Sequence, residues 1–310
     1  MKPMLTPNDV VNQTLNHTLL REKGVTLSIK RLDLIHPQVS GNKYFKLKYN
    51  IKEALSKHHQ TLLTFGGAYS NHIAATAFAA QKAGLVAIGV IRGENIQPLN
   101  PTLELAQSLG MNLHYVSREE YRKKTEEQFQ TDLKRQFGDF YLVPEGGTNQ
   151  LAIKGTQEIL TPEDETFTHI VSAIGTGGTI AGLAETVKKQ QSLIGISSLK
   201  GTFIHQEIQN LLKFYKIEPK GSFTIFDRYH FGGYAKYKPG LIDFIWMFYQ
   251  EFGIVLDPIY TGKTAFANWD LIQNNYFPKG SSILIIHTGG IQGNLGFIER
   301  TGIKLPTLSK

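Results

Sequence analysis

One lysine of this chain stands in a setting that could hold its amine in place for chemistry. Lys43 follows Gly41 and Asn42 at the predicted start of a helix. Lysine chemistry requires an amine whose position and charge are controlled, whereas most lysines near helix starts are solvated surface residues. The Gly-Asn turn therefore makes Lys43 a candidate nucleophile that needs support from other parts of the chain.

Four glycine-rich turns provide that support, because each follows a short apolar segment of strand-like character. They lie at residues 66–72, 145–149, 175–179 and 287–290. A single turn of this kind is equally well explained by the preference of strand-to-helix connections for glycine. Four together, with Ser, Thr and Asn between the glycines, indicate a backbone that closely approaches an anionic ligand.

The turn at residues 175–179, with the sequence GTGGT, is the strongest candidate for a phosphate site. Successive N–H groups at a helix N-terminus, beside threonine hydroxyls, bind phosphate. A dinucleotide fingerprint would need glycine at the position of Ile180 and an acidic residue near residues 197–200, and both are absent. The turn therefore suits a monophosphate better than a dinucleotide.

A second phosphate-like motif, Gly-Lys-Thr at residues 262–264, lacks the upstream glycine of a P-loop, because that position is Asp257. Two features therefore remain, a monophosphate site at residues 175–179 and Lys43, whose amine is a candidate nucleophile. This pair suggests pyridoxal phosphate, whose aldehyde forms a Schiff base with lysine.

Composition narrows the class of protein. The 310 residues, 41% hydrophobic and 19% charged, predict a globular protein of one large or two ordinary domains. The absence of cysteine excludes disulfides, thiolate metal sites and a cysteine nucleophile, and no metal site is expected. There is no signal-peptide core, and charges interrupt the longest apolar region, residues 241–260. We therefore expect a cytoplasmic protein with no membrane partner.

The net charge of +7 raises the question of nucleic acid as a partner. The most highly charged segment, residues 118–135, mixes both signs, which suits a solvated helix better than a surface that follows phosphates. No zinc-finger, RRM-like or basic-zipper spacing is present. We expect no nucleic-acid partner, and a preference for small anionic ligands.

Apolar segments alternate with helical segments along most of the chain. We expect strands at residues 25–30, 61–65, 86–91, 112–115, 141–143, 169–173, 193–197 and 283–287. We expect helices at residues 43–57, 71–83, 102–109, 118–137, 152–160, 180–189, 204–214, 241–252 and 264–274. Strands that are each followed by a helix indicate parallel sheets with helices on both faces, with ligands beyond the carboxyl ends of the strands.

These motifs together resemble those of the pyridoxal-phosphate enzymes of the tryptophan-synthase-β fold type (fold type II). Within it, the chain is similar to the branch that contains 1-aminocyclopropane-1-carboxylate (ACC) deaminase and D-cysteine desulfhydrase. The resemblance extends over residues 31–290 and includes residues 257–263 beside the motifs above. It implies an α/β fold of two domains, each a mostly parallel twisted sheet with helices on both faces. Residues 1–45 plus 151–310 would form the large cofactor-binding domain and residues 46–150 the small one, with the active site in the cleft between them.

The resemblance also assigns roles to single residues. Those implied to bind the cofactor are Lys43, Asn42, Lys46, Asn71, Gly175, Thr176, Gly177, Gly178, Thr179 and Thr261. Those implied to bind the substrate are Ser70, Asn71, His72, Tyr234, Tyr260 and Thr288. Those implied to act in catalysis are Lys43, Ser70, Tyr234 and Tyr260.

Two positions discriminate within the branch. ACC deaminases carry Glu after the second tyrosine and Leu in the final turn, where this chain has Thr261 and Thr288 as D-cysteine desulfhydrases do. A Glu near the pyridine nitrogen keeps it protonated and makes the ring a deep electron sink, which suits cleavage of a cyclopropane. A neutral hydroxyl at this position does not keep the nitrogen protonated, so the ring is a weaker electron sink. A weaker sink is sufficient when the substrate carries a good leaving group on Cβ.

The resemblance predicts a lyase that converts a small D-amino acid, first of all D-cysteine, to pyruvate, sulfide and ammonia. ACC deamination to 2-oxobutyrate stays open, as does a non-catalytic protein that binds pyridoxal phosphate. Departures from the family pattern, at Ser40 and at residues 73–75 where an arginine is common, bear on the substrate more than on the cofactor. A homodimer is expected from the resemblance alone.

Overall fold

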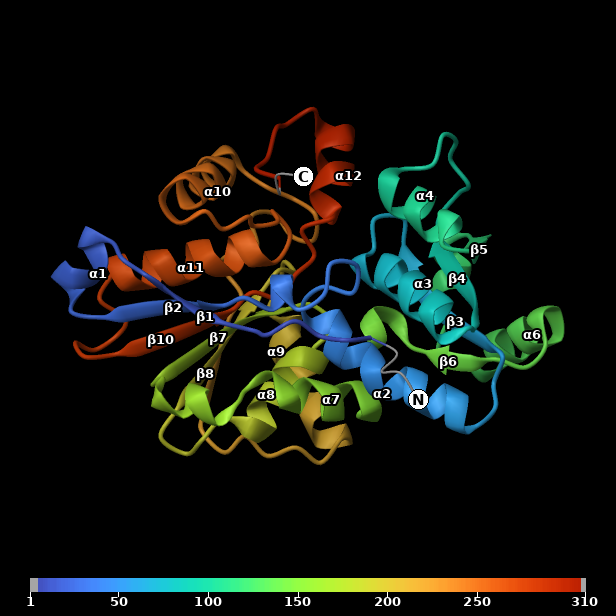
Figure 1. Ribbon diagram of the computed structural model, residues 1–310, viewed down its shortest axis with the longest axis horizontal. Coiled ribbons are helices and arrows are strands. Elements are labelled where there is room, and N and C mark those ends of the chain that lie inside the picture. The colour runs from blue at the N-terminus through green and yellow to red at the C-terminus, as the bar shows by residue number, and fades with distance from the viewer. Residues whose placement is uncertain (1–4, 308–310) are drawn as a thin grey trace.

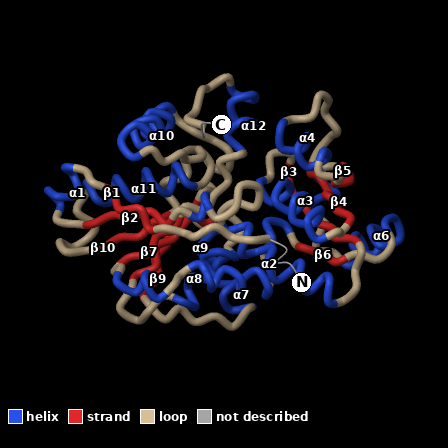
Figure 2. Tube along the Cα trace, in the orientation of Figure 1, coloured by secondary structure: helices blue, strands red, loops and turns tan. Residues whose placement is uncertain are grey.

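The computed structural model describes residues 5–307 and contains two separate β-sheets. Figure 2 shows the strands of each sheet as a distinct group. The described strands are β1 (Asn12–Leu15), β2 (Thr26–Lys30), β3 (Thr61–Gly67), β4 (Val86–Arg92), β5 (Met111–Val116), β6 (Tyr141–Val143), β7 (His169–Ile174), β8 (Ser192–Ser197), β9 (Ser222–Phe226) and β10 (Ser282–Ile286).

The larger sheet has six strands in the order β1-β2-β10-β7-β8-β9, and the smaller has four in the order β5-β4-β3-β6. All neighbouring strands pair in parallel except β1 and β2, which are antiparallel. The central strands β7 and β10 are apolar almost throughout, as expected for strands covered on both faces. The predicted fold class, two mostly parallel sheets flanked by helices, is confirmed.

Helices cover both sheets (Figure 1), and α2 runs from the region of the larger sheet toward the smaller one. The described α-helices are α1 (Thr18–Lys23), α2 (Asn42–Ser56), α3 (Asn71–Ala83), α4 (Pro101–Ser108), α5 (Arg118–Arg122), α6 (Glu127–Phe137), α7 (Gln150–Thr156), α8 (Gly178–Thr186), α9 (Phe203–Phe214), α10 (Pro239–Phe252), α11 (Thr261–Gln273) and α12 (Gly293–Thr301). Among the described residues, none of the helices combines the length and the hydropathy needed to cross a membrane.

A shared apolar core joins the two sheets. One cluster of buried side chains includes Leu62 and Ile91 from the smaller sheet and Ile170 and Leu284 from the larger. Helices α2 and α7 pack closely within this region, since a Cβ at Gly155 would lie only 1.9 Å from the carbonyl oxygen of Phe45. The smaller sheet takes its strands from residues 61–143, but the predicted domain boundaries themselves stay a prediction, and the cut after residue 45 falls inside α2.

Several elements differ from expectation. The predicted helix at residues 118–137 is wrong as a single helix, because α5 ends at Arg122 and α6 begins at Glu127. Strands β1 and β9 were not expected, since both are edge strands with polar or half-exposed positions rather than apolar segments. The short helices α1 and α12 were also missed.

Candidate active site

A cavity opens at the carboxyl ends of β3 and β7, and its walls come from both sheets. Its volume is about 890 Å³ including the open mouth. All predicted site residues line it except Gly178 and Thr261. Lining residues that sequence reasoning did not assign to the site include Ser40, Tyr69, Glu145, Gly146, Ile259 and Gln292.

Asn42 fixes Lys43 relative to the glycine-rich cup. Its side-chain oxygen accepts a hydrogen bond from Lys43 Nζ at 2.9 Å, and its Nδ2 donates to Thr179 Oγ1 at 2.8 Å. Burial lowers the pKa of Lys43 to about 8, and the negative charge of Asp257 limits the decrease. The amine is therefore both held in place and closer to its neutral, nucleophilic form than an ordinary lysine.

The cup itself is formed where α8 begins. Gly177 caps the helix with a φ of 82°, and the first-turn N–H groups that follow have no partner within the helix. Lys46 lies against this cup, and its Nζ donates to Gly146 O at 2.9 Å, Thr148 Oγ1 at 3.2 Å and Thr176 Oγ1 at 3.3 Å. The cup thus combines backbone donors, hydroxyls and a buried lysine, the groups that bind a phosphate.

A second helix start faces the cavity from the smaller sheet. Ser70 caps α3, and its hydroxyl accepts a bond from Ile73 N at 3.4 Å. Asn71 contacts the glycines of the final turn, since a Cβ at Gly290 would lie 2.5 Å from Asn71 Nδ2. This arrangement leaves the first N–H groups of α3 directed at a ligand, as needed for a carboxylate.

The side chain of His72 is neutral and its tautomer is defined by its neighbours. Thr64 Oγ1 donates to Val143 O at 2.8 Å and so accepts from His72 Nε2 at 2.9 Å. Burial, with Lys43 and Lys46 nearby, lowers the pKa of His72 well below its ordinary value. The remaining Nδ1 is an acceptor, so the imidazole has no proton to donate to a carboxylate.

Tyr234 and Tyr260 stand together on the cavity wall, with ring centroids 6.2 Å apart in an edge-to-face arrangement. Burial raises the pKa of Tyr260 well above its ordinary value, and Tyr234 and Asp257 raise it further. Burial also raises the pKa of Tyr234. Both phenols are therefore protonated at neutral pH and can donate hydrogen bonds.

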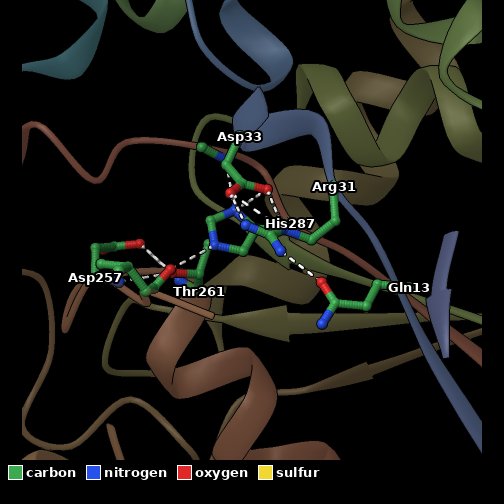
Figure 3. Close-up of polar contacts among 8 residues, drawn as sticks. Gln13, Arg31, Asp33, Asp257, Thr261 and His287 are labelled. Atoms are coloured by element: carbon green, nitrogen blue, oxygen red, sulfur yellow. Dashed lines mark hydrogen bonds and ion pairs between the residues drawn. The ribbon is translucent and has the colours of Figure 1, made fainter. Parts of the chain in front are cut away.

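The hydroxyl of Thr261 is bonded to Asp257 (Figure 3), and Thr261 is not among the residues that line the cavity. Its hydroxyl donates to Asp257 Oδ2 at 2.5 Å and accepts from the Asp257 N–H at 2.8 Å. The same carboxylate accepts from the N–H groups of residues 259–261, which fixes the start of α11. The predicted contact of Thr261 with the cofactor stays a prediction, whereas Thr288 lies on the cavity wall as expected.

A buried polar cluster supports the final turn from behind (Figure 3). Arg31 donates from Nε and Nη2 to the two oxygens of Asp33, at 2.9 and 2.7 Å. Burial alone would raise the pKa of Asp33, but the Arg31 guanidinium lowers it below its ordinary value. His287 donates from Nε2 to Val255 O at 2.8 Å and accepts at Nδ1 from Gly289 N–H at 3.2 Å, which holds the turn that carries Thr288.

The residues present fit pyridoxal phosphate. Three buried polar atoms of cavity-lining residues have no partner within the described chain, namely Ser40 Oγ, Asn71 Oδ1 and His72 Nδ1. The phosphate cup and a lysine of lowered pKa line one cavity, and the unpaired polar atoms belong to residues that line the same cavity. The fold and this site define the class of pyridoxal-phosphate enzymes of the tryptophan-synthase-β fold type.

Comparison with known proteins places the chain in a family. Residues 13–289 match the model of the family described as pyridoxal-phosphate dependent enzyme, so the chain belongs to that family and pyridoxal phosphate is its cofactor. It is 33% identical over 294 residues, 90% of this chain and 89% of the other, to a Pyrococcus horikoshii protein named "Putative 1-aminocyclopropane-1-carboxylate deaminase". It is 31% identical to the Arabidopsis thaliana "Bifunctional D-cysteine desulfhydrase/1-aminocyclopropane-1-carboxylate deaminase, mitochondrial", covering 87% of this chain and 73% of that one.

A solved structure agrees with this assignment. The structure described as "Crystal Structure Analysis of the ACC deaminase homologue" superposes with a TM-score of 0.79 and 31% identity, over 96% of this chain and 94% of that one. The predicted family and cofactor are thereby confirmed. Because the relatives are named as enzymes of this kind, the chain is an enzyme rather than a non-catalytic binding protein.

The lowered pKa of Lys43 predicts how the cofactor adds to the cofactor-free protein. The neutral amine attacks the aldehyde, so the rate should rise with pH and level off above a pH of about 8. From pH 7 to pH 9 we expect an increase of about tenfold, whereas a lysine of ordinary pKa would gain about a hundredfold without levelling off. Stopped-flow absorbance measures the rate, and a steady hundredfold rise would contradict the prediction.

The position of Lys46 predicts a role in cofactor affinity. Replacing Lys46 by Met removes the buried donor beside Thr176, and we expect the Kd for pyridoxal phosphate to increase about 10- to 100-fold, as for loss of a charge-assisted hydrogen bond. Lys52→Met, an exposed lysine on the same helix, is the matched control and should leave the Kd unchanged. Equal affinities of the two variants in a fluorescence titration would refute the role.

Proposed function

We propose that this enzyme catalyses α,β-elimination on a small D-amino acid, with D-cysteine as the first candidate. D-cysteine and water would give pyruvate, hydrogen sulfide and ammonia. The proposal builds on the family assignment and goes beyond it in naming the substrate. A homodimer and a cytoplasmic location belong to the same proposal.

The observation that carries the proposal is the presence of threonine hydroxyls at residues 261 and 288. The resemblance described above implies a carboxylate at the first of these positions and an apolar side chain at the second in ACC deaminases. Thr288 presents its side chain on the cavity wall, and Thr261 is held by Asp257. Glu145 is the only carboxylate among the described residues that line the cavity, and it pairs with Lys124 at 3.3 Å. With no carboxylate at residue 261 to hold the pyridine nitrogen protonated, the site suits a substrate that already carries a good leaving group on Cβ.

The chain's own residues divide the proton transfers between them. Pyridoxal phosphate held in this cavity would supply an electron sink for Cα of the substrate. Lys43, whose pKa is lowered to about 8, is the base that removes the Cα proton. Tyr234 and Tyr260, whose pKa values are raised, serve as donors toward the leaving sulfur rather than as bases. The N–H groups at the start of α3 and the Ser70 hydroxyl orient the substrate carboxylate.

A substrate panel tests the proposal. D-cysteine, L-cysteine, D-serine, β-chloro-D-alanine and ACC are supplied separately to the purified enzyme loaded with cofactor. We expect sulfide and pyruvate in equal amounts from D-cysteine, and at least tenfold lower activity on ACC. Formation of 2-oxobutyrate from ACC with no sulfide from D-cysteine would overturn the proposal.

ACC deamination is the second candidate, and a specific observation favours it. The Pyrococcus horikoshii relative and the similar solved structure both carry ACC deaminase in their descriptions. The reaction would convert ACC and water to 2-oxobutyrate and ammonia. The same panel separates the two candidates because their keto-acid products differ in mass.

A further inference from the structure

Lys263 is a buried lysine that the proposed chemistry does not use. It lies in the first turn of α11 with a relative exposure of 0%. Its Nζ donates to the carbonyl oxygen of Gly233 at 2.8 Å, the one hydrogen bond found for this amine among the described residues. A buried amine with a single backbone acceptor calls for an explanation, because burying a charge is unfavourable unless it is compensated.

The acceptor belongs to a turn with an unusual backbone. Phe231, Gly232, Gly233 and Ala235 all have positive φ, at 51°, 102°, 115° and 54°. Positive φ is unfavourable for residues other than glycine, so local preferences alone do not maintain this turn. Internal bonds help, from Gly233 N to His230 O and from Lys236 N to Gly233 O, at 3.0 and 3.1 Å. From outside the turn, Lys263 anchors it at Gly233, and Arg300 Nη2 donates to the carbonyl oxygen of Ala235 at 3.4 Å.

This turn carries Tyr234, which follows the anchored carbonyl directly. Tyr234 is 42% exposed as a residue and lines the cavity, where its ring meets that of Tyr260, so its position depends on the turn that carries it. The other tyrosine, Tyr260, is the cap residue of α11 and is held by Asp257. The first turn of α11 therefore fixes Tyr260 directly and reaches Tyr234 through Lys263 and Gly233.

The negative charge of Asp257 offsets part of the energetic cost of burying the charged Lys263 amine. Burial lowers the pKa of Lys263 to about 8, and the charge of Asp257 opposes the decrease. The carboxylate thus supports both parts of the arrangement, the cap at Tyr260 and the amine beneath Gly233. An apolar side chain of similar length at position 263 would fill the space but leave the Gly233 carbonyl without this donor.

We propose that Lys263 is a positioning residue that sets Tyr234 against Tyr260 by holding the Gly233 carbonyl. This inference rests on the proposed function to the extent that the two tyrosines act on the substrate together. Lys263 itself lies outside the cavity lining. It acts through the backbone of the turn, not by contact with a ligand.

Lys263→Met tests the structural part, with Lys236→Met, an exposed lysine of the same turn, as the control. Hydrogen exchange followed by mass spectrometry should show the peptide over residues 230–236 exchanging at least tenfold faster in Lys263→Met only. Cofactor affinity should stay within twofold of the wild type. The exchange measurement needs no substrate, so it tests the role of Lys263 even if the proposed substrate is wrong. Unchanged exchange would overturn the inference.

A double-mutant cycle with Tyr234→Phe separates positioning from general stabilisation. In the wild-type background Lys263→Met should lower kcat 10- to 100-fold on whichever panel substrate is turned over. In the Tyr234→Phe background it should change kcat less than twofold, since the hydroxyl that it positions is already gone. An equal loss in both backgrounds would mean that Lys263 supports the fold in general. If Lys263→Met does not fold, Lys263→Gln, which keeps an N–H donor, replaces it in the cycle and should show a smaller loss with the same dependence on Tyr234.

Discussion

Lys43→Ala should abolish turnover and leave no covalent attachment of the cofactor to residue 43. The variant removes the amine that reacts with the aldehyde and also the proposed base at Cα, so we expect kcat to fall by about 10³-fold or more. The amine of Lys43 is held 2.9 Å from Asn42 Oδ1, and no other lysine of the described cavity lining except Lys46 is near enough to replace it. Borohydride reduction followed by peptide mass spectrometry locates the attachment, and keto-acid formation measures turnover.

Lys48→Ala is the matched control for this variant. Lys48 lies on the same helix, but its side chain is 40% exposed and pairs with Glu158 on the surface. We expect wild-type turnover and a reduced cofactor adduct on Lys43 in this control. If Lys43→Ala still forms a reducible adduct within the cavity, the assignment of Lys43 is wrong, and Lys46 becomes the residue to examine.

The fold could be predicted from the sequence because its inner strands are buried on both faces. Segments such as Val86–Arg92 and His169–Ile174 are nearly continuous apolar sequences, and each is followed by a glycine or polar turn and a helix. Edge strands have no such signature. Asn12–Leu15 reads NQTL and pairs on one side only, so its strand character comes from tertiary pairing with β2.

The site could be predicted in part because its backbone motifs are local. A few consecutive residues are enough to recognise each of three motifs, namely the turn at Gly41, the cup at residues 175–179 and the turn at residues 287–290. Gln292 carries no such signal, since a single polar residue on a turn is as often solvated as directed into a cavity. Glu145 lies in the predicted turn at residues 145–149, but its residue type alone does not direct it into the cavity. Their place in the lining depends on how the two sheets meet.

Thr261 is a residue whose type predicts a contact with the cofactor, although the type does not fix where its hydroxyl is directed. The sequence places a hydroxyl where a carboxylate would tune the ring, but the structure commits the only proton of that hydroxyl to Asp257. A hydroxyl so engaged can still accept a hydrogen bond but has none left to donate. The acceptor for the Thr261 hydroxyl is Asp257, four residues earlier in the chain. The identity of residue 261 alone does not predict this hydrogen bond.

Gly41→Ala should be among the most damaging single substitutions in this chain. Gly41 caps α2 with φ 66° and ψ −146°, a region of backbone conformation that is essentially restricted to glycine. An added Cβ would lie 2.0 Å from the carbonyl oxygen of Thr288 and 2.6 Å from Gly289 Cα, and both are backbone atoms. Relief of this clash must separate α2 from the final turn, and it would displace Lys43 and Thr288 together. We expect a loss of about 4 kcal/mol or more, seen as a decrease in Tm of about 8 °C or more, with much weaker cofactor binding.

Gly138→Ala isolates the clash from the effect of the backbone conformation. Gly138 ends α6 with φ 76° and ψ −151°, close to the conformation of Gly41, but an added Cβ there has no neighbour within 4 Å. This control carries only the backbone strain, about 1–3 kcal/mol, and should lower Tm by about 2–6 °C while leaving the cofactor affinity unchanged. Thermal unfolding with and without cofactor measures both variants. Because both substitutions add the same methyl group at positive φ, the difference between them reports the close approach of Gly41 to Thr288. Equal decreases in Tm would show that this contact does not hold the lysine in position.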